Sequence, residues 1–280
     1  MPTLQNLTTS LSLAALLCTG AALAEVTSPH HHGDDSDANS AVPAHQHHPR
    51  DQDMPTPRGQ PVTLEVTGGK ASTGYLATPR RPVKGAVLVL HEYWGLNNWI
   101  RHEADLLADD GYLALAVDLY DGTVATTPDQ AMKLMGALDQ ARATQIETAG
   151  VAYLKQHAPK KKIATVGWCM GGGQSLNASL TNAADVNATV IYYGMPVTEV
   201  AQLKKLRGPV LGLFAKKDGW ITPDKVTAFD KALTEAGVKH SFQSYDADHA
   251  FANPTGGKFN PPAAHDADLR TKEFLAKSLL

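Results

Sequence analysis

The pattern of hydrophobic and polar positions changes at about residue 61. Residues 25–60 are rich in His, Asp, Pro and Ser and hold almost no large apolar side chains. Short apolar runs then alternate with longer amphipathic stretches, and residues 85–90 (GAVLVL) form an unbroken apolar run, typical of a strand covered on both faces. The pattern predicts one folded domain over residues 61–280, after a segment 25–60 that stays disordered because it buries too little apolar surface.

Within the domain, strand-like and helix-like patterns alternate. Two alternating stretches, PVTLEV and STGYLAT, indicate strands near its start. Further strands are expected at residues 85–90, 112–117, 162–166, 188–192, 209–215 and 240–245, and helices at residues 99–110, 128–156, a stretch after Gly171, 223–236 and a last stretch from about Pro262. This order predicts an α/β fold with a mostly parallel central sheet and helices on both faces.

The first 24 residues are predicted to be a signal peptide. Residues 11–24 (LSLAALLCTGAALA) are apolar but short for a membrane span, and they end in the small-x-small pattern Ala22-Leu23-Ala24. Residues 1–10 lack the Lys or Arg that usually opens an export signal. We expect a periplasmic or secreted protein, without stable membrane insertion after cleavage. Cys18 would leave with the signal, and Cys169 would remain as a lone thiol, which is either a buried hydrophobe or a reactive group.

Histidines are concentrated before the domain. Segment 25–60 holds six of the twelve in the chain, namely His30, His31, His32, His45, His47 and His48. Imidazoles in such a tract can bind zinc or copper weakly. The alternative, which we favour, is a solvated tether. The formal net charge is −3 and the lysines are dispersed, so the sequence shows no basic face for nucleic acid.

The most specific motif is residues 167–173, GWCMGGG, between a predicted strand and a predicted helix. It has the form of a nucleophile elbow with Cys169 in the nucleophile position. Flanking glycines let strand and helix pass closely, and the amide of Met170 would face a developing oxyanion. A phosphate-binding loop is the competing interpretation, but the dinucleotide fingerprint and the Walker lysine are both absent.

A thiol nucleophile needs a base, and in an elbow fold the acid and then the histidine follow it along the chain. Asp218 follows one apolar strand and His249 follows the next. Asp218 would fix the imidazole tautomer, and His249 would exchange the proton with Cys169. Other acids nearby remain alternatives to Asp218; these are Asp224, Asp246 and Asp248.

Residues 91–95, HEYWG, begin where the strand 85–90 ends. The loop after this strand supplies the second oxyanion amide in elbow folds, which would be that of Tyr93. Glu92 would then lie beside the thiol. A metalloprotease motif is excluded because position 95 is Gly and not His.

Together the segments GWCMGGG, LHEYWGLN, VDLYDG, FAKKDGW and DHAFANP resemble the dienelactone hydrolase family, in an order that spans nearly all of residues 61–280. The resemblance implies an α/β-hydrolase fold, and a Cys169-His249-Asp218 triad that cleaves an ester or lactone through a thioester. It implies oxyanion donors at Tyr93 and Met170, and a Glu92 that contacts the resting thiol and helps to form the thiolate. It implies no metal and no cofactor.

Family members hold a substrate carboxylate with arginines, and no motif aligns an arginine of this chain with those positions. The reaction class is therefore better defined than the substrate. Two other functions stay open. One is a metal-binding protein that acts through its His-rich segment, and the other is a non-catalytic relative that binds a ligand where the active-site cleft of the family would be.

Overall fold

The computed structural model describes residues 50–280. The predicted signal peptide and the histidines of the His-rich segment lie outside the described residues. None of the helices in residues 50–280 combines the length and the apolar character needed to cross a membrane.

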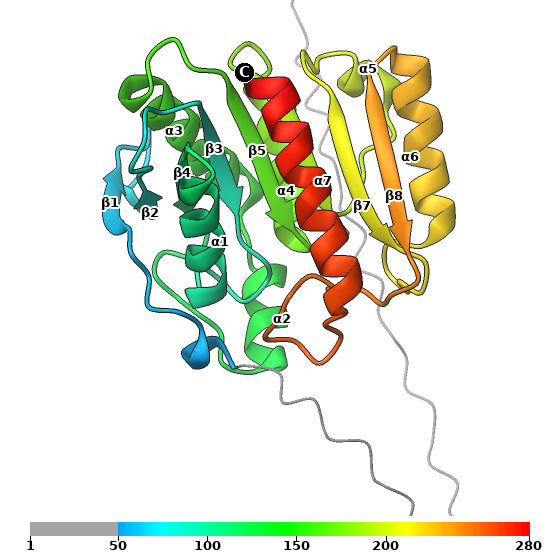
Figure 1. The fold of residues 1–280 in the computed structure, drawn as a ribbon, viewed down its shortest axis with the longest axis horizontal. Helices are drawn as coiled ribbons and strands as arrows, with labels where there is room; N and C mark the ends of the chain where they lie inside the picture. Colours follow the sequence, from blue (N-terminus) through cyan, green and yellow to red (C-terminus); the bar gives the residue numbers. More distant parts are fainter. Residues whose placement is uncertain (1–49) are drawn as a thin grey trace, which may run out of the picture. The chain divides into compact units, whose positions relative to one another are not determined.

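The fold is an eight-stranded sheet with the order β1-β2-β4-β3-β5-β6-β7-β8 (Figure 1). The six strands from β3 to β8 run parallel, whereas β2 is antiparallel to both β1 and β4. This confirms the expected α/β fold. The strands are β1 (Gln60–Leu64), β2 (Ser72–Ala77), β3 (Gly85–Leu90), β4 (Tyr112–Val117), β5 (Ile163–Trp168), β6 (Val186–Tyr192), β7 (Val210–Ala215) and β8 (His240–Tyr245).

The helices lie between the strands along the chain. The expected single helix over residues 128–156 is wrong, because Asp139 starts a new helix by accepting hydrogen bonds from the amides of Ala141 and Arg142. The helices are η1 (Asp51–Asp53), α1 (Asn98–Asp109), α2 (Pro128–Gly136), α3 (Gln140–His157), α4 (Met170–Thr181), α5 (Val200–Leu203), α6 (Pro223–Ala236) and α7 (Pro261–Leu279).

Alternate residues of each central strand belong to different core clusters. On β3, Val87 and Val89 join the cluster that includes residues of α1 and α7, whereas Leu88 and Leu90 join the cluster that includes residues of α3. Neighbouring side chains on a strand point to opposite faces, so α1 and α7 cover one face and α3 the other. Figure 1 shows α1 and α7 in front of the sheet. Burial on both faces explains the unbroken apolar runs.

Residues just before β1 contact α1. The carboxylate of Asp51 accepts hydrogen bonds from the backbone amides of Asn98 and Trp99 at 3.2 and 2.9 Å, in the first turn of α1. The guanidinium of Arg58 donates to Asp109, near the end of the same helix, at 2.7 and 3.0 Å. The polar stretch before residue 60 thus follows the length of α1.

Candidate active site

Cys169 occupies a sharp bend between β5, which ends at Trp168, and α4, which begins at Met170. Its backbone has φ 55° and ψ −119°, a conformation that non-glycine residues rarely adopt. A Cβ atom on Gly171 would lie 2.2 Å from the carbonyl oxygen of Leu90, so only glycine lets α4 pass this close to β3. The glycines of the motif therefore hold the thiol at the carboxyl edge of the sheet.

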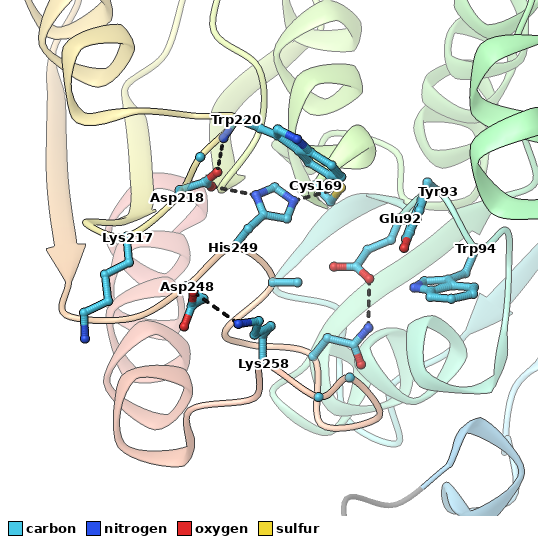
Figure 2. A pocket seen from close by; sticks show the side chains of 15 residues that line it. Glu92, Tyr93, Trp94, Cys169, Lys217, Asp218, Trp220, Asp248, His249 and Lys258 are labelled. Atoms are coloured by element: carbon cyan, nitrogen blue, oxygen red, sulfur yellow. Dashed lines mark hydrogen bonds and ion pairs between the residues drawn. The ribbon is translucent and has the colours of Figure 1, made fainter. Parts of the chain in front are cut away.

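Three side chains from separate strand ends form a hydrogen-bonded row (Figure 2). The Nε2 atom of His249, which follows β8, lies 3.1 Å from the Sγ atom of Cys169. The Nδ1 atom of the same ring lies 2.6 Å from the Oδ2 atom of Asp218, which follows β7. A proton on Nδ1 leaves the Nε2 lone pair facing the thiol, which is the arrangement of a base that activates a nucleophile.

The other oxygen of Asp218 is held by the backbone. The amides of Trp220 and Ile221 donate to Oδ1 at 2.8 and 2.9 Å. Burial alone would raise the pKa of Asp218, but the hydrogen bonds from His249, Ile221 and Trp220 outweigh it and leave this pKa below its ordinary value. Asp218 is therefore an ionised and fixed partner for the imidazole.

The three alternatives to Asp218 lie outside the hydrogen-bonded row of Cys169, His249 and Asp218. Asp224 lies exposed in the first turn of α6. Asp246 forms an ion pair with Lys217 at 3.0 Å, and Asp248 forms a longer one with Lys258 at 3.5 Å. None of these pairs involves His249.

Cys169 is buried, with 8% of its surface exposed. Burial raises the pKa of its thiol, and the negative charge of Glu92 raises it further. Hydrogen bonds from the backbone amides of Met170 and Tyr93 act in the opposite direction. One amide thus acts on the sulfur from the first residue of α4 and the other from the loop after β3, positions from which they can also receive an oxyanion.

Glu92 is a buried carboxyl beside this centre, with 1% of its surface exposed. Desolvation raises its pKa to about 7, although a hydrogen bond from Asn253 lowers it in part. The Nδ2 atom of Asn253 donates to Oε2 at 2.8 Å, whereas Oε1 makes no well-aligned hydrogen bond; the hydroxyl of Tyr193 also acts on this carboxyl and lowers its pKa slightly. Glu92 can therefore change protonation near neutral pH.

Asn253 was not among the residues expected from the sequence. Its Oδ1 atom accepts hydrogen bonds from the amide and the hydroxyl of Thr255 at 2.9 and 2.7 Å, so its amide N–H₂ group is turned toward Glu92. The signal that could have found it is its place in DHAFANP, a polar residue four positions after His249.

His91 was also missed. The fully buried ring accepts a hydrogen bond at Nε2 from the amide of Leu119 at 3.1 Å, and its Nδ1 atom lies 2.6 Å from the carbonyl oxygen of Glu92. Burial lowers the pKa of His91, which favours the neutral ring. An acceptor at Nε2 requires the proton on Nδ1, so His91 donates to the loop that carries Glu92 and Tyr93.

A cavity of about 350 Å³ is bordered by Cys169, Asp218, His249, Glu92 and Asn253. Its wall includes Trp94 and Trp220, and also Lys217, Lys258 and the glycines Gly256 and Gly257. The cavity is large enough for a small organic molecule in contact with the thiol. Within residues 50–280 no group of three or more His, Cys, Asp or Glu side chains is arranged to hold a metal ion.

Comparisons with known proteins identify the family of the chain. The model of the dienelactone hydrolase family matches residues 72–279. The chain is 32% identical to Protein usf of Aquifex pyrophilus over 231 residues, which are 79% of this chain and 99% of that protein. It is 26% identical to a carboxymethylenebutenolidase of Pseudomonas sp. strain P51 over 227 residues, covering 77% and 94% of the two chains.

A solved structure gives the same result. This chain superposes on the crystal structure of a protein from Klebsiella pneumoniae that is provisionally named a dienelactone hydrolase. The TM-score is 0.69 at 26% identity, and the match covers 78% of this chain and 98% of that one. Its fold belongs to the α/β-hydrolases. From the family match, the relatives and the shared fold, we conclude that this chain belongs to the dienelactone hydrolase family and is an enzyme that hydrolyses esters or lactones.

Proposed function

We propose that the protein is a cysteine-dependent hydrolase of carboxylic esters or lactones, of the carboxymethylenebutenolidase type, that works through a thioester intermediate. The observation that carries the proposal is the row in which His249 lies 3.1 Å from the thiol of Cys169 and 2.6 Å from Asp218. Such a row supplies a nucleophile, a base and an orienting acid within hydrogen-bonding reach.

In the first half of the reaction, Nε2 of His249 takes the thiol proton and Sγ of Cys169 attacks the substrate carbonyl carbon. The C–S bond forms as the carbonyl π pair moves to oxygen, and the amides of Tyr93 and Met170 stabilise this oxyanion. Its collapse breaks the bond to the leaving oxygen, which receives the proton from His249. A thioester remains on Cys169.

In the second half, His249 takes a proton from a water molecule that attacks the thioester. The C–S bond breaks, the carboxylic acid leaves, and the sulfur recovers its proton from the imidazolium. Asp218 stays ionised throughout and stabilises the charged ring. Each oxyanion amide is expected to contribute about 3 to 4 kcal/mol to the transition state.

Glu92 sets the resting state in this scheme. While its carboxylate is ionised beside the buried thiol, the raised pKa of Cys169 keeps the sulfur protonated. A protonated thiol resists oxidation, because the thiolate is the form that oxidants attack. Substrate binding then has to shift this balance toward the thiolate, a step in which Glu92 takes part.

The test is hydrolysis of an activated aryl ester by the purified protein and three variants. Cys169→Ala is expected to abolish turnover, and Asp218→Asn to lower kcat by about 10³- to 10⁴-fold. Asp224→Asn, which changes an exposed acid that does not contact His249, is the matched control and should match the wild type.

Two further results decide the mechanism. Rapid acid quenching should trap the acyl group on the peptide that contains Cys169, seen by mass spectrometry. Unchanged turnover in a folded Cys169→Ala protein, checked by circular dichroism, would refute the proposal.

A further inference from the structure

The charges around the cavity suggest which substrates it takes. Lys217 and Lys258 are the only Lys or Arg side chains among its lining residues. Both are more than half exposed, and each is paired with a neighbouring carboxylate, Asp246 or Asp248. Exposed pairs of this kind carry little net field, because the two charges nearly cancel and water screens them.

The inner wall carries acidic groups without a free cation. The Oε1 atom of Glu92 is buried and makes no well-aligned hydrogen bond; the group that acts on this carboxyl besides Asn253 is the buried hydroxyl of Tyr193, which carries no positive charge. The carboxylate of Asp218 is already engaged by His249 and two amides. A carboxylate on a substrate, close to the ester that reacts with Cys169, would lose its water and gain no positive partner, which is a costly way to bury a charge.

Aromatic side chains provide the favourable contacts instead. The indole of Trp220 packs edge-on against His249, with ring centroids 5.2 Å apart, and that of Trp94 packs against Tyr93 at 4.7 Å. Both indoles line the cavity, and Trp220 is 53% exposed although it is a large apolar side chain. A planar apolar group next to the ester would cover these rings and gain contact area.

We propose that this cavity selects uncharged esters or lactones with an aromatic or similarly apolar group, and discriminates against substrates with a carboxylate near the scissile bond. The proposal rests on the proposed function, and it names a substrate class for the same site. It sets this chain apart from an enzyme built to hold an anionic substrate.

The first experiment compares two acetate esters that differ in charge, methyl 4-acetoxybenzoate and 4-acetoxybenzoate, each corrected for its rate in buffer. We expect kcat/KM to favour the uncharged ester by about tenfold or more. Asp246→Asn leaves Lys217 without its carboxylate, and Asp246 does not itself line the cavity; this variant should raise kcat/KM for the anionic ester by about two- to fivefold and leave the uncharged ester unchanged. Asp230→Asn, which removes a carboxylate paired with His240 on a different part of the surface, is the matched control and should change neither rate.

The second experiment does not depend on turnover. Alkylation of Cys169 by uncharged iodoacetamide and by anionic iodoacetate is followed on its peptide by mass spectrometry. The rate ratio should exceed that of N-acetylcysteine by about tenfold or more in favour of iodoacetamide. If the anionic ester or iodoacetate reacts as fast as its uncharged partner after these corrections, the charge proposal is overturned. If both esters resist hydrolysis while the alkylation ratio holds, the hydrolase proposal fails and the charge selectivity of the cavity stands.

Discussion

The Nδ1 atom of His91 lies 2.6 Å from the carbonyl oxygen of Glu92, in the same peptide group that carries the N–H of Tyr93. The carbonyl and the N–H of a trans peptide point in opposite directions. A ring that holds the oxygen therefore also aims the Tyr93 N–H toward Cys169. The second ring nitrogen accepts from Leu119, so the loops after β3 and β4 are joined through His91.

Two substitutions of His91 separate its two hydrogen bonds. The amide of His91→Asn can replace the Nδ1 donor, whereas the amide oxygen of His91→Gln can replace the Nε2 acceptor. Without this donor the carbonyl of Glu92 keeps only its longer hydrogen bond from the amide of Gly95, at 3.2 Å, and the Tyr93 N–H is less firmly aimed. His91→Gln should therefore lower kcat by about ten- to a hundredfold with little change in KM, and His91→Asn should keep more of the wild-type kcat. Steady-state kinetics measure this, and urea midpoints show whether both variants fold. Equal kcat in two stable variants would contradict a role in aiming the amide.

Glu92→Gln should make the resting thiol more reactive. Burial is the largest cause that raises the pKa of Cys169, and the charge of Glu92 is the next. Removal of that charge lowers the thiol pKa, so alkylation of Cys169 by iodoacetamide at pH 8 should be about three- to tenfold faster. Glu103, another carboxyl whose burial raises its pKa to about 7, gives the control variant Glu103→Gln. Slower alkylation of Glu92→Gln would instead identify Glu92 as the base that forms the thiolate.

Gly171→Ala should destabilise the protein by about 1 to 3 kcal/mol or prevent folding, because the added Cβ would lie 2.2 Å from the carbonyl oxygen of Leu90. Gly173 lies in the same helix, and a Cβ there would meet no atom closer than 3.5 Å. Gly173→Ala should therefore be neutral or stabilise by up to about 1 kcal/mol. Urea unfolding of both variants measures the difference. Equal midpoints would show that the backbone shifts easily at the bend.

Glu147 makes stability depend on pH. It is fully buried on α3, its Oε1 atom has no partner, and desolvation raises its pKa to about 8. The folded protein keeps this proton while the unfolded chain releases it, so the contribution of Glu147 to the free energy of unfolding falls as pH rises from about 4.5 to about 8. Glu147→Gln has no such titrating group. The difference between its free energy of unfolding and that of the wild type should therefore shift in favour of the variant as pH rises from 5 to 8. The exposed Glu235→Gln is the control; a parallel pH dependence in all three proteins would mean that Glu147 is ionised in the fold.

Much of the fold could be predicted from the sequence because its strands are buried on both faces. The runs at residues 85–90 and 112–117 match β3 and β4, which are buried at every position. The break between α2 and α3 was missed because both helices continue one amphipathic pattern. The direction of β2, antiparallel to β4, depends on pairing across the sheet that no local pattern records.

The residues of the candidate site also fall into two groups, those that the sequence predicts and those that it does not. Cys169, Asp218 and His249 could be proposed because each lies within four residues of the carboxyl end of a strand, where side chains of a parallel sheet converge, and because their order along the chain is that of nucleophile, acid and base. His91 and Asn253 were missed, because their roles depend on contacts with residues 28 and 161 positions away. An isolated polar residue gives no sign of such a distant partner.

The hydrogen bonds from Asp51 to the first turn of α1 limit how far the chain can be truncated from its N-terminal side without weakening the domain. A chain that starts at residue 61 would lose this carboxylate together with Arg58. Two helix amides would then lose their acceptor, and two carboxylates of α1, those of Asp105 and Asp109, would lose hydrogen bonds and ion pairs with Arg58. Loss of such a helix-terminal acceptor commonly costs about 1 kcal/mol. Biochemical work on a protein freed of its His-rich segment should therefore keep residue 50 onward, so that any change in behaviour reports on the histidines and not on a weakened α1.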